Sequence, residues 1–482
     1  MDWMIPVQAA LVLLPWAWGT VFLGWCLAPA NGQRYSMALI ALGAGAYLGY
    51  MVMAGVLYFA NRWQFPVFGT YVAFALITGA LLTVAAWKPW FGALRQALPQ
   101  AKPAPLSPLE SGATIVIATL AVCAVAFAAL ENYLRPAETW DALQHWALES
   151  TAFLRHHTVG ESIDGAYRFT KTSHWPTVKL ISAWSGWAAS HTVAQNAVYA
   201  PWVLLQAGLA LAAAGIGLCL TARPLLAALA AYLVSATPMI TVHTALGGYA
   251  DLWQAAGVFI FMALVLAAPG TRFIPRLLAC CFLAMTAILF TKGNGAVYVG
   301  ILLAALAAGY VLAKTRWAIS VPLLVALTGV VIWLFNHGVD VSLGGYRIAL
   351  LPSDNLVALG ERTSGIPGSN WAAVWENTQE AWGYSASFNG ALPLIAVAIV
   401  ILTAAQRLEL GFAHFFSLCV PFAVAIFLIL AQRYSEYFFE FSTPAKDTGF
   451  SRFSMVLYLS ALPALLVFLG SSLAGSAADK AR

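Results

Sequence analysis

Thirteen long apolar stretches constrain the fold of this chain more than any other feature. A helix needs about 20 apolar residues to cross about 30 Å of hydrocarbon, and lipid offers backbone groups no external hydrogen-bond partner, so each stretch should be a helix. Hydrophobic residues make up 61% of the chain, and the mean hydropathy of +0.79 indicates that lipid is its main solvent. We predict an all-α polytopic membrane protein of about 13 transmembrane helices. The approximate spans are 5–27, 37–60, 69–87, 113–130, 197–220, 224–243, 249–268, 274–291, 295–313, 317–335, 389–405, 412–431 and 453–473.

The distribution of Lys and Arg predicts the orientation of the bundle. With the amino terminus outside, the inner loops hold twelve Lys/Arg and three carboxylates, whereas the outer side holds twelve Lys/Arg and sixteen carboxylates. The net charge is therefore +9 inside and −4 outside, in agreement with +5 for the whole chain. This asymmetry also supports the number of spans, because one miscounted helix would scramble the sorting.

The predicted topology places the conspicuous polar clusters on the outer side. Three outer loops are long, at 131–196, 336–388 and 432–452, and two short outer turns lie at 247–251 and 291–295. The inner loops are short and contain no glycine-rich phosphate cradle, so no nucleotide-binding domain and no nucleic-acid partner is expected. An enzyme of this kind would use a donor that is already outside or embedded in the membrane, and membrane lipids would surround it.

The first outer loop opens on the segment most suited to chemistry. Residues 140–155 contain no Pro or Gly and predict a helix, on which Asp141, His145 and Glu149 share one face. Asp141 would lie in the first turn, where the helix dipole favours an ionised carboxylate that can act as a general base. Two other interpretations stay open. The triplet can form a solvated face that supports the helix start, or it can bind a divalent cation; no other cofactor is expected.

Asp251 and Lys292 are the notable ionisable residues of the two short outer turns. Asp251 follows two glycines at the outer mouth of a span, where an acid is costly and indicates function, although a helix N-cap is an equal alternative. Lys292 lies in Thr-Lys-Gly-Asn-Gly, where glycines allow backbone N–H groups to approach an anion. Its alternative role is to snorkel to the lipid headgroups.

Basic residues recur in two long outer loops, against the positive-inside tendency. Lys171 lies in the first loop, and Arg433 and Arg452 flank the last loop together with Glu436. Their position outside predicts specific anionic or carboxylate partners.

The arrangement of these motifs resembles the GT-C superfamily of integral-membrane glycosyltransferases, which includes protein O-mannosyltransferases and lipid A aminoarabinose transferases. The resemblance rests on Trp-Asp at 140–141, Gly-Tyr-Ala-Asp-Leu at 248–252 and Thr-Lys-x-x-Gly at 291–295, and it covers roughly residues 113–335. It implies a GT-C-like helical bundle with a partly helical first outer loop. Three spans in 1–112 precede this module, and 336–482 adds an outer loop and three spans.

The resemblance implies transfer of a sugar from a polyprenyl-phosphate-linked donor to an acceptor on the outer face, with inversion at the anomeric carbon. Asp141 would be catalytic, by binding or deprotonating the acceptor. The substrate-binding residues would be His145, Tyr249, Asp251 and Glu436. The donor-phosphate-binding residues would be Lys171, Lys292, Arg433 and Arg452.

Two other functions compete with the transferase. A lipid-linked polysaccharide polymerase or ligase would depend mainly on outer-loop arginines and histidines. A lipid or glycan transporter would carry charges at mid-span and repeated broken helices, whereas the predicted spans carry almost no charge. For the transferase we expect a bacterial inner membrane location with a periplasmic active site, and lipid A, a glycan or a protein as acceptor.

Overall fold

The structure is a computed structural model in which the main chain divides into two compact units, Met1–Val299 with Leu469–Arg482, and Gly300–Phe468. Each unit is described by itself. The described residues are 4–27, 33–63, 69, 72–73, 75–85, 107–134, 150, 153, 176–190, 196–271, 274–314, 329, 333, 337–343, 346–351, 356–359, 362–365, 371–384, 388, 390–405, 410–434 and 448–480.

Helices make up the first unit. Its elements are α1 (Met4–Cys26), α2 (Arg34–Arg62), α4 (Pro108–Leu134), α6 (Thr177–Ser190), the 3₁₀ turn η2 (Asn196–Tyr199), α7 (Ala200–Thr221), α8 (Pro224–Ser235), α9 (Pro238–Leu246), α10 (Ala250–Ala267), the 3₁₀ turn η3 (Ala268–Gly270), α11 (Ile274–Leu289) and the start of α12 (Gly295–Lys314).

The chain is a multi-pass helical membrane protein. Its described residues contain eight helices that are long and apolar enough to cross a membrane, or nine if α8 and α9 form one bent span. Three further expected spans correspond to shorter apolar helices at Ala75–Ala85, Ile274–Leu289 and Ala391–Thr403, and most of 317–335 lies outside the described residues. The polytopic helical class is confirmed, and the total of 13 spans stays a prediction.

The span expected at 224–243 is broken into α8 and α9, which meet at an angle of 54°. Pro238 begins α9, and a proline there cannot continue the hydrogen-bond ladder of the preceding helix. The carbonyl of Ser235 is satisfied instead by the Gln206 Nε2 amide, at 2.7 Å, and by the Thr241 hydroxyl, at 3.2 Å. Neighbouring side chains thus replace the lost backbone bonds, as lipid requires.

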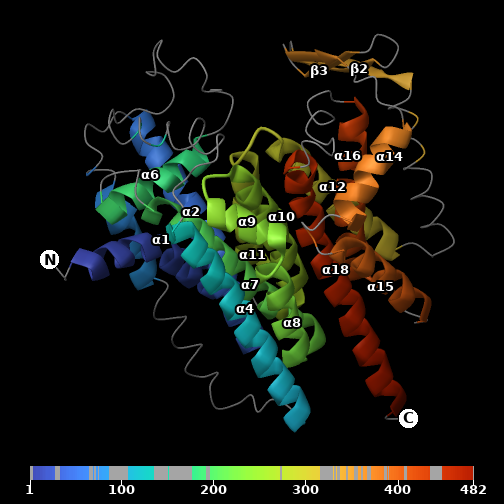
Figure 1. The fold of residues 1–482 in the computed structure, drawn as a ribbon, viewed down its shortest axis with the longest axis horizontal. Coiled ribbons are helices and arrows are strands. Elements are labelled where there is room, and N and C mark those ends of the chain that lie inside the picture. The colour runs from blue at the N-terminus through green and yellow to red at the C-terminus, as the bar shows by residue number, and fades with distance from the viewer. Residues whose placement is uncertain are drawn as a thin grey trace. The chain divides into compact units, whose positions relative to one another are not determined.

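α10 is the central helix of the first unit, and α4 is a peripheral one. Seventeen of the eighteen residues of α10 are buried, and it packs against α2, α7 and α11. By contrast, α4 exposes Ile115, Val122 and Phe127, as expected for a lipid-facing surface, and it lies alongside α8 (Figure 1). The residues of α10 are therefore the best shielded place for a polar group in this unit.

Contacts in the first unit join residues that the predicted topology places on the same side. On the outer side, the Asn132 amide donates to the Thr244 carbonyl at 2.7 Å. On the inner side, a guanidinium nitrogen of Arg276 donates to the Trp25 carbonyl at 3.4 Å. These contacts fit the alternation of the predicted spans.

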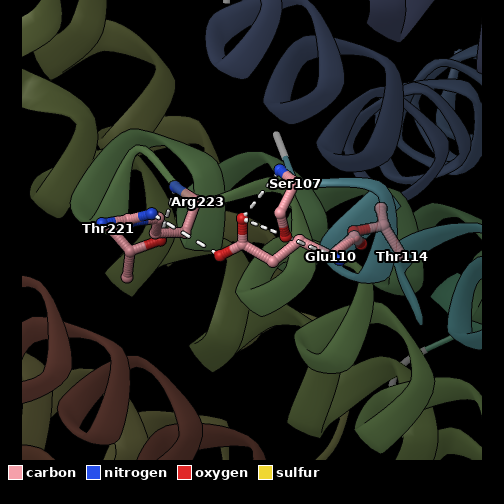
Figure 2. Close-up of polar contacts among 5 residues, drawn as sticks. All are labelled: Ser107, Glu110, Thr114, Thr221 and Arg223. Atoms are coloured by element: carbon pink, nitrogen blue, oxygen red, sulfur yellow. Dashed lines mark hydrogen bonds and ion pairs between the residues drawn. The ribbon is translucent and has the colours of Figure 1, made fainter. Parts of the chain in front are cut away.

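A capping box and an ion pair lie at the start of α4, on the predicted inner side (Figure 2). Ser107 and Glu110 form a capping box, in which the Ser107 hydroxyl accepts from the Glu110 N–H and Glu110 Oε2 accepts from the Ser107 N–H, both at 3.2 Å. Glu110 Oε1 also lies 3.7 Å from Arg223 Nη1, and the two side chains are 38% and 53% exposed. This pair connects α4 to the start of α8 at an open surface.

The second unit departs from the all-α expectation because it contains a small antiparallel sheet. Strands β1 (Val339–Leu343), β2 (Tyr346–Leu351), β3 (Leu356–Leu359) and β4 (Arg362–Gly365) pair in sequence order, with Val341 opposite Ile348 and Ala349 opposite Ala358 (Figure 1). The sequence Val-Asp-Val-Ser-Leu alternates with the period of a strand, and two glycines separate it from the next strand. Local patterning therefore explains the sheet.

Besides the later part of α12, the second unit contains further helical elements. They are α14 (Trp371–Gln379), the π-helical turn η5 (Glu380–Tyr384), α15 (Ala391–Ala405), α16 (Phe412–Tyr434) and most of α18 (Thr448–Lys480). The Trp382 indole donates to the Ser454 hydroxyl at 2.8 Å, and the Gln432 amide donates to the Thr378 hydroxyl at 3.2 Å. These bonds tie η5 to α18 and α14 to α16.

The first outer loop contains a helix that the sequence analysis did not predict. The expected helix at 140–155 lies almost wholly outside the described residues. α6 is formed farther along the loop and packs on α1 and α2, with Ile181 and Trp184 fully buried. The Trp184 indole donates to the Leu11 carbonyl at 3.2 Å, so the end of this loop belongs to the body of the first unit.

Candidate functional site

Two glycines shape the turn that carries Asp251 into the first unit. Gly247 and Gly248 have φ of 61° and 77°, a backbone region that side-chain-bearing residues rarely occupy. A Cβ at Gly247 would also clash with the ring of Tyr199. The turn ends α9 and places Asp251 in the first turn of α10, where the helix dipole favours its ionised form. The predicted tight turn is confirmed.

The second turn carries Lys292 between α11 and α12. Thr291 donates its hydroxyl to the Ala287 carbonyl at 2.7 Å, and Gly295 donates its N–H to the Lys292 carbonyl at 2.8 Å. A Cβ at Gly295 would clash with the Ile288 carbonyl. The glycine thus lets the chain fold tightly and holds Lys292 at the outer end of both helices.

Asp251 and Lys292 form a buried ion pair. The Lys292 Nζ atom donates to Asp251 Oδ1 at 2.6 Å, across 41 positions in the sequence, and the side chains are 15% and 7% exposed for Lys292 and Asp251. Removing two charges from water costs several kcal/mol per ion, and their attraction offsets this cost only when the geometry is good. Two residues that the sequence assigned to separate roles are therefore partners here.

Two amide oxygens accompany this pair, and sequence reasoning missed them. Gln254 lies one helical turn after Asp251 on α10 and is 2% exposed, and its Nε2 reaches the Ile288 carbonyl at 3.4 Å. Asn294 immediately precedes α12. Among the described residues, neither Gln254 Oε1 nor Asn294 Oδ1 has a hydrogen-bond partner, although both atoms are buried. A buried acceptor without a donor is costly, so each oxygen suits a ligand or water that brings an O–H or N–H group.

Large aromatic side chains support α10 on the side of Trp253. The Trp253 ring lies 5.8 Å from Tyr50 and 5.7 Å from Trp202, both edge-on, and all three residues are fully buried. Trp202 in turn lies 5.5 Å from Tyr199. This packing fixes the start of α10, and with it the position of Asp251.

Tyr249 contacts the same aromatic group through its backbone, and its side chain is directed to α9. Its carbonyl accepts from the Trp202 indole at 2.9 Å, and its ring lies 5.4 Å from His243. His243 Nδ1 is 3.0 Å from the Met239 carbonyl, so this nitrogen carries a proton. His243 is 3% exposed, and sequence reasoning missed it because it lies within an apolar helix.

The structure gives no arrangement that relates the other predicted catalytic and phosphate-binding residues to this pair. Asp141, His145, Lys171 and Glu436 lie outside the described residues. Arg433 and Arg452 belong to the second unit, where the Arg433 guanidinium lies 5.9 Å above the Trp371 ring. Within the described segments, no group of three or more His, Cys, Asp and Glu side chains gathers to hold a metal ion.

Comparison with known proteins found no family model, curated protein or solved structure that matches the chain. The resemblance to GT-C enzymes thus rests on short motifs. Two of these motifs, at 248–252 and 291–295, contain the residues of the buried ion pair.

Proposed function

We propose that this protein is an integral-membrane glycosyltransferase that moves a sugar from a polyprenyl-phosphate-linked donor to an acceptor on the outer face. The proposal includes a GT-C-like bundle of 13 spans in a bacterial inner membrane, with a periplasmic site. The acceptor is lipid A, a glycan or a protein.

The buried pair of Asp251 and Lys292 is the observation that carries the proposal. Charges that are 7% and 15% exposed at the mouth of apolar spans are costly, and such residues are generally retained for binding or chemistry. The pair also lies on the predicted outer side, where a lipid-linked donor would present its sugar. It joins the motifs at 248–252 and 291–295, which are 41 positions apart at the paired residues.

The site supplies the interactions that glycosyl transfer needs. An acceptor hydroxyl or amine attacks the anomeric carbon, a new bond forms there, and the bond to the phosphate oxygen breaks with its electron pair leaving on the phosphate. Asp141 takes the acceptor's proton in this proposal. Lys292 supports the growing negative charge on the leaving phosphate, because an ammonium has three N–H donors and can hold a carboxylate and a phosphate oxygen together.

Asp251, Gln254 and Asn294 suit the sugar better than the phosphate. All three present acceptor oxygens, which attract hydroxyl or amino hydrogens and repel the oxygens of a phosphate. A sugar bound there would satisfy the buried oxygens of Gln254 and Asn294. In the proposal, the sugar therefore lies toward α10, and its phosphate lies toward the 291–295 turn.

The test is transfer of radiolabelled sugar from a synthetic polyprenyl-phosphate donor to membrane acceptors by the purified protein in lipid nanodiscs. We expect transfer by the wild type and a loss of at least a hundredfold in Asp141→Asn and in Lys292→Gln. Donor binding should persist in Asp141→Asn, which acts at the acceptor, and weaken in Lys292→Gln. Absence of transfer by the wild type with every donor sugar tested would contradict the proposal.

A lipid or glycan transporter is the second candidate function, and the broken span favours it. Discontinuous helices commonly form substrate sites in transporters, and α8 and α9 meet at 54°. The break here is filled by Gln206 and Thr241, which lowers its capacity to bind a substrate. Movement of a fluorescent polyprenyl-linked sugar across proteoliposomes, without transfer to an acceptor, would favour the transporter over the transferase.

A further inference from the structure

An apolar cavity of about 740 Å³ lies beside the turn that carries Lys292. Its walls come from the outer half of α2, the first residues of α6 and the last turns of α11, all within the first unit. Phe59, Trp63 and Phe290 form exposed parts of the wall, at 55%, 67% and 42%. The cavity is therefore open at the surface of the first unit.

The wall offers hydrocarbon to an occupant. Its two threonines direct their hydroxyl hydrogens into the backbone, Thr177 to the Phe290 carbonyl at 2.5 Å and Thr286 to the Phe282 carbonyl at 2.9 Å. Apart from the Tyr58 hydroxyl and the Trp63 indole, the lining side chains are apolar or already bonded to the backbone, so a sugar or a peptide would leave most of its polar groups without partners there, at a high cost. A hydrocarbon chain has no such groups, so it is the occupant that this wall accepts.

The end of α11 connects the cavity wall to the buried ion pair along the chain. Phe290 lines the cavity, and the next residue, Thr291, lies with its Oγ1 atom 3.9 Å from the sulfur of Met51, another lining residue. Lys292 follows and reaches Asp251. The last lining residue of the apolar cavity is thus separated by one residue from a largely buried cation. A molecule with a long apolar chain and an anionic head would suit this arrangement.

We propose that this cavity holds the hydrocarbon chain of the lipid-linked donor, with the donor's phosphate at the 291–295 turn. The inference rests on the proposed function for the identity of the head. Moving a chain from lipid into protein gains little hydrophobic free energy, because both surroundings are apolar. Close packing along α2 and α11 would therefore select the chain by its shape, while Lys292 holds the head. α2 precedes the segment that resembles GT-C enzymes, so the N-terminal spans would contribute directly to donor recognition.

Gly55 allows a test that fills the cavity without disturbing its walls. It lines the cavity, and a Cβ built on it meets no atom within 4 Å, so Gly55→Phe can project into the open volume. Gly112 on α4 provides the matched control, because a Cβ there also meets nothing within 4 Å and it lies outside the cavity wall. Ala287→Leu, at another lining position, is a second filling variant if Gly55→Phe folds poorly.

The experiment measures binding of a radiolabelled polyprenyl monophosphate to each purified variant in nanodiscs. We expect Kd to rise at least tenfold in Gly55→Phe and to stay within twofold of wild type in Gly112→Phe. Inorganic phosphate should not compete at millimolar concentration, because it has no chain. Unchanged binding in Gly55→Phe and Ala287→Leu would overturn the inference, as would equal competition by phosphatidylglycerol vesicles, which would identify a site for bulk phospholipid.

The same variants separate this inference from the proposed function. Chain-dependent binding without sugar transfer by the wild type would support the cavity and contradict the transferase. Sugar transfer with an unchanged KM for the donor in Gly55→Phe would support the transferase and contradict the cavity.

Discussion

Two ion pairs in the first unit differ in burial, and burial determines how strongly water and salt screen each pair. Glu110 and Arg223 lie 3.7 Å apart with side chains 38% and 53% exposed, whereas Asp251 and Lys292 lie 2.6 Å apart with side chains 7% and 15% exposed. Water and salt screen the first pair, so it contributes at most about 1 kcal/mol. The second pair has lost most of its hydration, so removing one charge would take from the other its partner at 2.6 Å.

The two pairs also differ in their surroundings. Glu110 has a structural task in the capping box that begins α4 (Figure 2). The N-cap residue of α10 is Tyr249, which makes no side-chain cap hydrogen bond, and buried amide oxygens lie on the next turn of α10 and in the 291–295 turn. These features, a costly and well-aligned pair with unsatisfied acceptors on neighbouring turns, are the reason why we propose that the pair serves a ligand and not stability alone.

Removing only one charge of the buried pair should give the largest loss of stability. We expect Asp251→Asn to lower the free energy of unfolding by about 3–5 kcal/mol, because the Lys292 ammonium would lose its nearest opposite charge. Glu110→Gln is the matched control, since Gln at that position keeps the capping box and removes only the charge; it should cost less than about 1 kcal/mol. Denaturation of both variants in mixed micelles measures the difference, and equal losses would mean that burial does not distinguish the pairs.

A double-mutant cycle sharpens the comparison. Asp251→Asn combined with Lys292→Gln should be less destabilising than the two single losses added together, with an interaction free energy of about 1–3 kcal/mol. The corresponding cycle for Glu110→Gln and Arg223→Gln should give about 0.2–1 kcal/mol. Additive losses at Asp251 and Lys292 would show that the two residues act independently, against the 2.6 Å contact.

Gln254 tests whether the acceptors beside the buried pair serve a ligand. Gln254→Met preserves the approximate volume and removes one long hydrogen bond, so it should change stability by only about 0.5–1.5 kcal/mol. We expect a loss of about tenfold in kcat/KM for sugar transfer, equivalent to about 1.4 kcal/mol of transition-state binding. Unchanged transfer would mean that Gln254 Oε1 merely binds a structural water.

A change in ionic strength should produce the smallest change in the interaction free energies of the two pairs. Raising ionic strength from 0.01 to 1 M shortens the screening length from about 30 to about 3 Å. The interaction free energy of Glu110 with Arg223 should therefore fall toward zero, a change of a few tenths of a kcal/mol, while that of Asp251 with Lys292 stays within error. The two double-mutant cycles repeated at both salt concentrations provide the measurement, and an equal salt dependence would contradict the difference in burial.

Much of the helical arrangement could be predicted because lipid leaves few alternatives. Apolar length alone located the spans such as α7, α10 and α16, and two glycines before Asp251 predicted the turn that the positive φ angles confirm. The break between α8 and α9 was not predicted, although Pro238 lies inside the expected span 224–243, because apolar residues predominate on both sides of it. The strands at 339–365 were missed because five-residue alternation is weak beside the strong signal of the spans.

The site could be predicted only residue by residue. Asp251 and Lys292 were selected because each is an isolated charge beside glycines, but their partnership depends on how α10 packs against α11, which no local pattern encodes. Gln254 was missed for a similar reason. An uncharged glutamine in an apolar helix becomes notable only when its oxygen proves to be buried without a partner.

The most direct test of the account is the initial rate of sugar transfer by wild type, Asp251→Asn and Glu110→Gln, each normalised to folded protein in the same nanodisc preparation. We predict that Asp251→Asn loses at least a hundredfold in rate while Glu110→Gln keeps the wild-type rate within twofold. Asp251→Glu, which restores the charge on a longer side chain, should recover part of the loss. Equal rates in wild type and Asp251→Asn would contradict the claim that the buried pair belongs to the functional site.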